Sequence, residues 1–221
     1  MRDKLFCVLA SLAVGLFSGQ ARGVARCAST EACLRLIQQA QQDTRTMAAE
    51  FVQVKHVSLL DEPLVSTGRV IFRRPDRMLL KIEQPQPLTV TIQGRDVQIP
   101  NLPERERQAL GMAPMAAMFT QLNAIFTGSM QALEQEFEVV AAEEDLAIQV
   151  DLVPRQAAWK RMFRSIHLRF AGPELAAQKI RLDDALGDSL EITLRDVQRN
   201  IDIPDSMFDL ATPRADTSGQ K

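Results

Sequence analysis

Two histidines and two serines are the side chains from which nucleophilic catalysis could start. His56, His167, Ser165 and Ser189 all fall within alternating patterns that predict strands. A nucleophilic serine stands on a strained strand-to-helix turn, and neither serine has that context. No glycine-rich sequence for holding phosphates or dinucleotides is present. An outer-membrane-directed hydrolase is the enzyme alternative, but it lacks a convincing triad. We therefore predict no catalytic residue, no cofactor and no enzymatic activity.

Three aspartates in the segment LDDALGD are the candidates for a metal site. Carboxylates such as those of Asp183, Asp184 and Asp188 can gather around a divalent cation. Their spacing fits no calcium-binding loop, however, and aspartate and glycine are typical of a turn between two strands. We interpret this segment as a turn and expect no metal.

The N-terminus has the pattern of an export signal. Arg2 and Lys4 precede an apolar run over residues 5–17, which is short for a membrane span, and small and polar residues follow. Arg26 before Cys27 argues against a lipoprotein signal. We expect a cleaved signal peptide over residues 1–25, one soluble domain over 26–212 and a disordered polar tail over 213–221.

Two cysteines, Cys27 and Cys33, remain after cleavage, and an even number in an oxidising compartment favours a disulfide. In a continuous helix six residues span about 9 Å, which is too far for the bond. Cys27 is therefore expected to fold back against the first turn of a helix that begins near Thr30. A redox or metal pair is not expected, because there is no C-x-x-C motif and no histidine nearby.

Composition narrows the class of partner. The chain has 221 residues, enough for one domain with a sizeable core, and a net charge of −2, which gives no reason to expect nucleic acid. It has nine methionines, one tryptophan and no tyrosine. Methionine suits surfaces that adapt to variable apolar partners, although a methionine-tolerant core is an equal alternative.

Residues 68–94 predict three consecutive strands, separated by Pro75, Pro85 and Pro87. Each strand has one apolar face; Leu79 breaks the alternation. The apolar positions are Val70 and Phe72, then Met78, Leu80 and Ile82, then Leu88, Val90 and Ile92.

The flanking segments extend this sheet and add helices. We expect an amphipathic helix from Thr30 to about Met47, a strand over residues 51–60, a short strand over 97–99, and five further strands over 137–142, 147–153, 165–171, 177–183 and 189–197. Between the two groups of strands, a helical stripe contains Met115, Met118, Phe119, Leu122, Ile125 and Phe126. These elements predict a meander that curls into a barrel or half-barrel. The helices either complete its core or form a lid over an apolar cavity.

Several landmarks within residues 47–94 resemble the N-terminal half of the LolA family, periplasmic carriers of lipoproteins toward the outer membrane. They are F-x-Q at 51–53, Gly68, Arg74-Pro75, Gln84-Pro85 and Gly94. The C-terminal half is similar in layout. The resemblance implies an α+β fold, in which an incomplete antiparallel barrel of about ten strands is covered by an N-terminal helix and a helical lid insertion. It also implies a monomer in the periplasm, with an inner-membrane donor and an outer-membrane acceptor.

The resemblance also implies a cavity for the acyl chains of lipoproteins or other lipids, and a latch residue, Arg74, that holds the lid shut. Helix-end carbonyls would be the partners of Arg74; the alternative is a surface arginine beside Asp76 or Glu83. The expected cavity residues are Phe51, Val70, Phe72, Met78, Leu80, Ile82, Val90, Met115, Met118, Phe119, Leu122 and Phe126. The alternatives to a lipoprotein carrier are a docking module with a solidly packed barrel and a carrier of another lipid-linked product.

Overall fold

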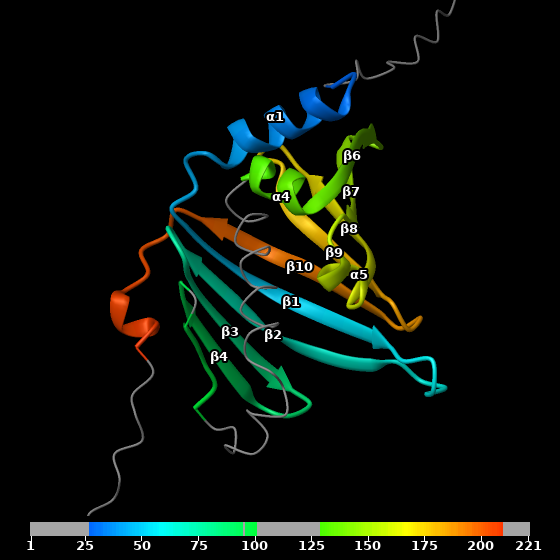
Figure 1. Ribbon diagram of the computed structural model, residues 1–221. Coiled ribbons are helices and arrows are strands. Elements are labelled where there is room, and N and C mark those ends of the chain that lie inside the picture. The colour runs from blue at the N-terminus through cyan, green and yellow to red at the C-terminus, as the bar shows by residue number, and fades with distance from the viewer. Residues whose placement is uncertain (1–26, 95, 101–128, 210–221) are drawn as a thin grey trace, which may run out of the picture.

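In the part of the chain that the structure describes, ten antiparallel strands form a single curled sheet (Figure 1). The computed structural model describes residues 27–94, 96–100 and 129–209. The strand order is β5-β4-β3-β2-β1-β10-β9-β8-β7-β6, so β5 and β6 are edges and the sheet does not close. The strands are β1 (Thr46–His56), β2 (Leu64–Arg73), β3 (Arg77–Gln84), β4 (Leu88–Gln93), β5 (Asp96–Gln98), β6 (Phe137–Glu144), β7 (Ala147–Pro154), β8 (Phe163–Ala171), β9 (Ala176–Asp184) and β10 (Ser189–Arg199). The expected incomplete barrel of about ten strands is confirmed.

Helix α1 (Thr30–Gln41) lies across one end of the sheet (Figure 1). It begins at Ser29, whose hydroxyl accepts a hydrogen bond from the Ala32 amide, as N-cap serines do. Leu34 and Ile37 are buried in the core. At its start the Thr30 hydroxyl binds both backbone groups of Ala141 on the edge strand β6. Helix α1 thereby covers part of an edge that would otherwise be unpaired.

The boundary between α1 and β1 differs from the sequence prediction. The helix ends at Gln41 rather than near Met47, and β1 covers Thr46–His56 rather than residues 51–60. Met47 suits the helical spacing, but it also lies two residues before Ala49 and four before Phe51. All three side chains are buried, with strand spacing, because pairing with β2 outweighs local helical periodicity.

The outer face of the sheet carries a second, smaller core that the sequence did not predict. Leu79, the residue that breaks the alternation of β3, packs there with Ile203 and Phe208. The chain from Ile203 to Phe208 runs outside the sheet and includes a short 3₁₀ helix, η1 (Asp205–Met207) (Figure 1). Leu79 is thus apolar because the C-terminal segment covers it.

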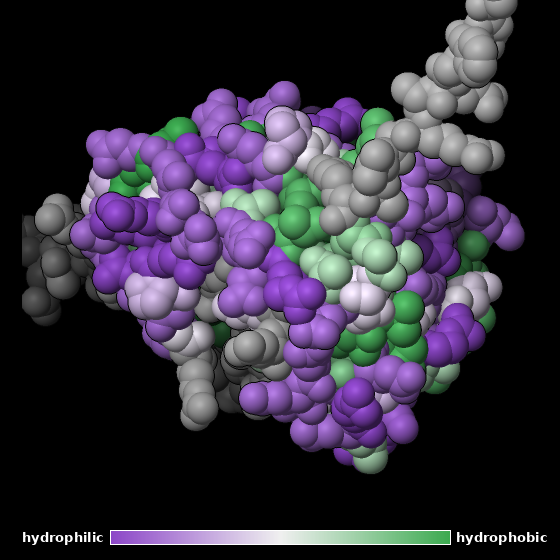
Figure 2. Space-filling model, turned by 90° about the horizontal axis from the view of Figure 1, so that it is seen from above, coloured by the Kyte–Doolittle hydropathy of each residue, from purple (hydrophilic) through white to green (hydrophobic). Residues whose placement is uncertain are grey.

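Two short helices complete the part of the chain that the structure describes. Helix α4 (Met130–Glu136) leads directly into β6 and buries Leu133, and α5 (Ala157–Lys160), which was not expected, joins β7 to β8. The expected lid stripe from Met115 to Phe126, the signal peptide and the tail lie outside the described residues. Polar residues cover most of the surface seen in Figure 2; the largest apolar area runs through the middle of this view, and smaller ones lie near its edges.

Candidate functional site

Three rows of apolar side chains cross the inner face of strands β1 to β4. Strand register places the members of each row opposite one another. The first row is Met47, Phe72, Met78 and Ile92; the second is Ala49, Val70, Leu80 and Val90; the third is Phe51, Gly68, Ile82 and Leu88. Period-two alternation on adjacent strands makes such rows, because every second residue faces the same side.

The exposure of these side chains increases from the first row to the third. All four members of the first row are at most 5% exposed. In the second row Leu80 is partly exposed, and in the third row Ile82 and Leu88 are partly exposed although Phe51 is buried. The apolar face therefore continues from fully buried side chains into side chains that are only partly buried.

The seven expected cavity residues that the structure describes all lie on this face. They are Phe51, Val70, Phe72, Met78, Leu80, Ile82 and Val90. Met115, Met118, Phe119, Leu122 and Phe126, the expected lid side of the cavity, are outside the described ranges.

Arg74 extends from the end of β2 to the C-terminal end of α1. Its Nη2 donates to the Gln41 carbonyl oxygen at 3.0 Å, and its Nε donates to the Thr44 carbonyl oxygen at 2.5 Å. The last carbonyls of a helix have no partner within the helix, so a cation at this end is favourable both as a donor and toward the helix dipole. The neighbouring Arg73 instead pairs with Asp205 and the Ile203 carbonyl. Arg74 thus has as partners the last carbonyl of α1 and the carbonyl of Thr44 in the loop that follows.

A second arginine, which the sequence analysis did not identify, holds the same helix end. Arg199 at the end of β10 donates to the Ala40 carbonyl oxygen at 3.0 Å and pairs with Glu174 at 2.5 Å. Its side chain is 13% exposed. No local pattern indicates this role, because Arg199 follows Ala40 by 159 residues in the sequence.

A polar pocket of about 730 Å³ lies next to this corner of the sheet. Its lining includes Arg45, Arg73 and Arg74 together with Asp43 and Asp202. None of the apolar residues of the three rows lines it. The pocket is therefore separate from the apolar face.

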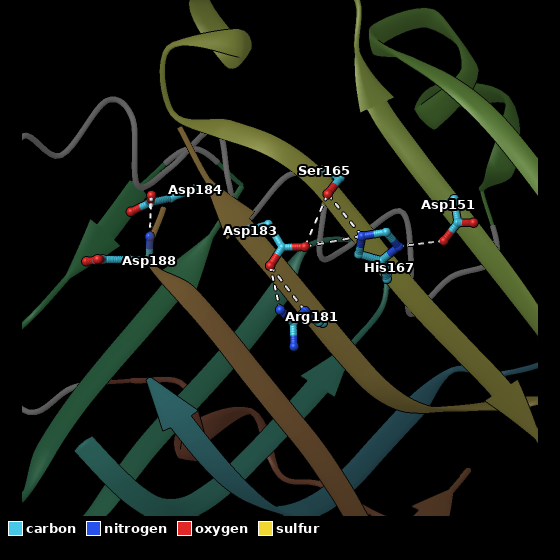
Figure 3. Close-up of polar contacts among 7 residues, drawn as sticks. All are labelled: Asp151, Ser165, His167, Arg181, Asp183, Asp184 and Asp188. Atoms are coloured by element: carbon cyan, nitrogen blue, oxygen red, sulfur yellow. Dashed lines mark hydrogen bonds and ion pairs between the residues drawn. The ribbon is translucent and has the colours of Figure 1, made fainter. Parts of the chain in front are cut away.

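Ser165, His167 and two aspartates form a polar cluster on β7, β8 and β9 (Figure 3). His167 Nε2 lies 2.9 Å from the Ser165 hydroxyl, and His167 Nδ1 lies 2.6 Å from Asp151. Asp183 lies 3.2 Å from the same hydroxyl and 3.3 Å from His167 Nε2. Ser165, His167 and Asp183 were considered separately in the sequence, and Asp151 was not a candidate. Strand pairing places His167 opposite Asp151 and Ser165 opposite Asp183.

The charges around this cluster oppose acyl transfer. An attacking serine develops an adjacent oxyanion, which needs donors around it. Asp183 instead places a carboxylate beside the Ser165 hydroxyl. Burial alone would raise the pKa of Asp183, but hydrogen bonds from Arg181 and Ser165 and the nearby charges of Arg181 and His167 lower it below 3.8, so the carboxylate is ionised at neutral pH. The cluster therefore has the Ser–His–Asp hydrogen bonds of a catalytic triad, but a negative charge lies where a triad needs hydrogen-bond donors for the oxyanion.

The other chemically interesting residues are dispersed. His56 is exposed at the end of β1, opposite Ser189, and β10 and β9 separate its strand from that of His167. Asp184 accepts hydrogen bonds from the Leu186 and Asp188 amides, as in a turn. The Asp188 carboxylate in turn accepts a hydrogen bond from the Ser58 amide. Figure 3 shows Asp184 and Asp188. Within the described ranges no three His, Cys, Asp or Glu residues are placed to hold a metal ion.

An open, curled antiparallel sheet with an apolar inner face and a helix held over it places the chain among proteins of the LolA-like fold. The family model described as "Outer membrane lipoprotein carrier protein LolA" matches residues 42–211, and the chain belongs to this family. A curated relative, the outer-membrane lipoprotein carrier protein of Dechloromonas aromatica strain RCB, is 28% identical over 186 residues, or 80% of this chain and 83% of that protein. The resemblance inferred from residues 47–94 is thereby confirmed.

Solved structures with a similar fold share little sequence with this chain. A LolA superfamily protein from Nitrosomonas europaea is 10% identical, and its structure matches with a TM-score of 0.44. The match covers 83% of this chain and 99% of that protein's chain. MucB is 12% identical, with a TM-score of 0.49, 82% of this chain and 62% of that chain covered. Among the helices described here, none has the length and apolar character needed to cross a membrane.

Proposed function

We propose that the protein is a periplasmic carrier that binds the acyl chains of lipoproteins or other lipids on the inner face of its sheet and moves them toward the outer membrane. Membership of the LolA family, whose members are lipoprotein carriers, supports the class of cargo. The observation that carries the proposal is the row structure of the inner face. Its apolar side chains continue without a polar interruption from the buried Phe72 to the partly exposed Leu80 and Ile82.

The chemistry of binding is desolvation alone. Each buried CH₂ of an acyl chain contributes about 0.8 kcal/mol, so even part of a chain laid along Leu80, Ile82 and Leu88 would be held out of water. Side chains without polar atoms accept chains of different length and branching. This property suits a carrier, and nothing in it requires covalent chemistry.

Arg74 is the proposed latch of this carrier. It joins β2, which bears part of the apolar face, to the end of α1, which packs against β6 and buries Leu34 and Ile37 in the same core. Hydrogen bonds from a charged donor contribute about 1.5–3 kcal/mol, enough to keep a helix in place and small enough for a tightly held acyl chain to displace. Binding and release of cargo then correspond to movement of α1 relative to the sheet.

Export into the periplasm is part of the proposal. The N-terminal signal pattern supports it, and so does the Cys27–Cys33 disulfide, since such bonds persist in oxidising compartments. A donor at the inner membrane and an acceptor at the outer membrane are the partners that such a carrier needs.

Mass spectrometry of lipids that co-purify with the mature protein expressed into a periplasm tests the proposal. A stoichiometric acylated species that a fluorescent fatty acid displaces would support it and begin to identify the cargo. A protein that is empty and also rejects the fatty acid would overturn it in favour of the packed docking module.

A matched pair of variants tests whether the inner face is the site. Leu80→Trp places a large ring among the partly exposed apolar side chains and should weaken binding of the fluorescent fatty acid. Val140→Trp makes a comparable change on β6, where the side chain is 54% exposed, and should leave binding unchanged. Equal effects of the two substitutions would exclude the inner face as the site.

A further inference from the structure

The sheet divides near α1. The ladder between β9 and β10 runs only from Ser189–Asp183 to Thr193–Lys179, whereas β10 remains paired with β1 as far as Arg199. Beyond Thr193 the two strands separate, and a pocket of about 530 Å³ lies between the β8–β9 turn and β10. Backbone hydrogen bonds therefore do not join β9 to β10 at this end of the sheet.

Arg199 spans this gap with side-chain contacts. Its guanidinium binds Glu174 in the β8–β9 turn through Nε at 2.8 Å and Nη2 at 2.5 Å. The neighbouring Leu175 carbonyl accepts a hydrogen bond of 2.6 Å from the side chain of Gln41, the last residue of α1. The end of α1 and Arg199 together connect the two separated parts of the sheet.

Arg199 and Arg74 bind the same two residues from different strands. Arg74 donates to the backbone carbonyls of Gln41 and Thr44, whereas Arg199 donates to the side-chain oxygens of the same residues, at 3.2 Å and 3.1 Å. Gln41 is 3% exposed and Thr44 is 2% exposed. Gln41 and Thr44 are also bonded to each other, because the Thr44 amide donates to the Gln41 carbonyl oxygen at 3.0 Å and the Thr44 hydroxyl donates to Gln41 Oε1 at 3.3 Å. The two arginines therefore hold one buried pair of mutually bonded residues, and losing a charged donor to such buried groups costs free energy.

We propose that Arg199 is a second positioning residue for α1, which acts together with Arg74 and is aligned by Glu174, so that α1 moves off the sheet only when both guanidiniums release Gln41 and Thr44. This role rests on the proposed carrier function. It assigns to α1 a second task, which is to hold the β8–β9 turn against β10 across the gap.

The geometry distinguishes this role from that of an ordinary ion pair. A guanidinium donates in several directions at once, which lets Arg199 bind Glu174 and the helix end together. A lysine could pair with Glu174 but could not reproduce that fork. Arg199→Lys should therefore loosen α1 almost as much as Arg199→Gln. Glu174→Gln keeps every donor to the helix end and should have a smaller effect, since the Glu174 side chain is 64% exposed.

Amide hydrogen exchange of the purified full chain, followed by mass spectrometry of its peptides, tests the proposal without any lipid. Arg199→Gln and Arg199→Lys should increase exchange several-fold in the last turn of α1 and in residues 172–175, and leave β7 unchanged. Arg195→Gln is the matched control, because it removes an exposed arginine from the same strand. The proposal is overturned if Arg199→Lys matches the wild type, or if exchange rises equally throughout the sheet.

Release of the fluorescent fatty acid separates this inference from the proposed function. If the wild-type protein binds the fatty acid, Arg199→Lys should release it several-fold faster. The effect of adding Arg74→Leu should be non-additive, because both arginines bind Gln41 and Thr44. If the wild type binds no fatty acid, the carrier function fails while the exchange result still decides the position of α1. Unchanged release in Arg199→Lys would refute a shared latch, and so would strictly additive effects of the two substitutions.

Discussion

Gly68 on β2 pairs with Phe51 on β1, and the tip of the Phe51 ring occupies the space that a side chain at Gly68 would need. A Cβ added at Gly68 would lie 2.9 Å from the tip of that ring and 2.0 Å from the Lys81 carbonyl oxygen on β3. Gly68 also stands where the pairing of β2 with β3 shifts register, next to Thr67. The absence of a side chain at this position lets three strands approach closely under the third row of the apolar face.

We predict that Gly68→Ala strongly destabilises the fold. The added carbon meets backbone on one side and an aromatic ring on the other, so β2 or β3 must shift, at a cost of roughly 1–3 kcal/mol or more. Urea denaturation would measure the change in free energy of unfolding. Ser66→Ala on the same strand is the control and should have little effect. Equal stability of Gly68→Ala and the wild type would contradict the close approach.

Arg74→Leu should loosen α1 and alter the retention of cargo. The substitution leaves the Gln41 and Thr44 carbonyls without their charged donor, which we expect to cost roughly 2–4 kcal/mol. Release of a bound fluorescent fatty acid should become faster in stopped-flow measurements. Arg69→Leu is the control, since Arg69 lies on the same strand, is 61% exposed and pairs only with Glu50 among the interactions described. Unchanged release in Arg74→Leu would remove its latch role.

Reduction of the Cys27–Cys33 disulfide should destabilise the protein modestly. The two residues are six positions apart, so the bond closes a short loop and restricts the unfolded chain by only about 2 kcal/mol. Denaturation with and without dithiothreitol measures this contribution. The double variant Cys27→Ser/Cys33→Ser should be insensitive to the reductant. A wild-type protein that is equally insensitive would show that the bond contributes nothing to stability.

The stability contributed by Asp183 should depend on pH. Its folded-state pKa lies below the ordinary value of 3.8, because contacts with Arg181, Ser165 and His167 outweigh the effect of burial. Because the pKa of Asp183 is lower in the folded than in the unfolded protein, its carboxylate stabilises the fold at any pH above its unfolded-state pKa. This stabilisation is lost as the pH falls through its folded-state pKa. Thermal unfolding from about pH 6 to about pH 3 should therefore show the wild type losing its advantage over Asp183→Asn in the acid range. Asp209→Asn, which removes an exposed carboxylate elsewhere in the chain, is the control.

Phe208 should anchor the C-terminal segment to the outer face of the sheet. It is 1% exposed and packs with Leu79 and Ile203. Phe208→Ala should lower the free energy of unfolding by about 3 kcal/mol. The adjacent Met207 is 40% exposed, so Met207→Ala should change stability little. If the two substitutions had the same effect, the outer core would not contribute as its packing indicates.

Local sequence determined most of the strands and the composition of the apolar inner face. Alternation along residues 68–94 has a period of two, which is a property of the extended backbone itself, so Val70, Phe72, Met78 and Val90 could be assigned to one face before any tertiary contact was known. The family landmarks around Arg74-Pro75 lie in the same stretch. The start of α1 near Thr30 could also be predicted, because the residues that begin a helix are close together in the sequence.

Tertiary structure decided where α1 ends, which residues hold it and what covers Leu79. Met47 satisfies both helical and strand periods, and only its pairing with β2 selects the strand. Arg199 meets Ala40 across 159 positions, and Phe208 meets Leu79 across a comparable distance, so no local pattern contains either contact. Ser165, His167 and Asp151 came together in the same way, by strand pairing. The sequence encodes the preference of each segment, whereas contacts between distant segments depend on how all the strands of the sheet pair, which no short stretch of sequence determines.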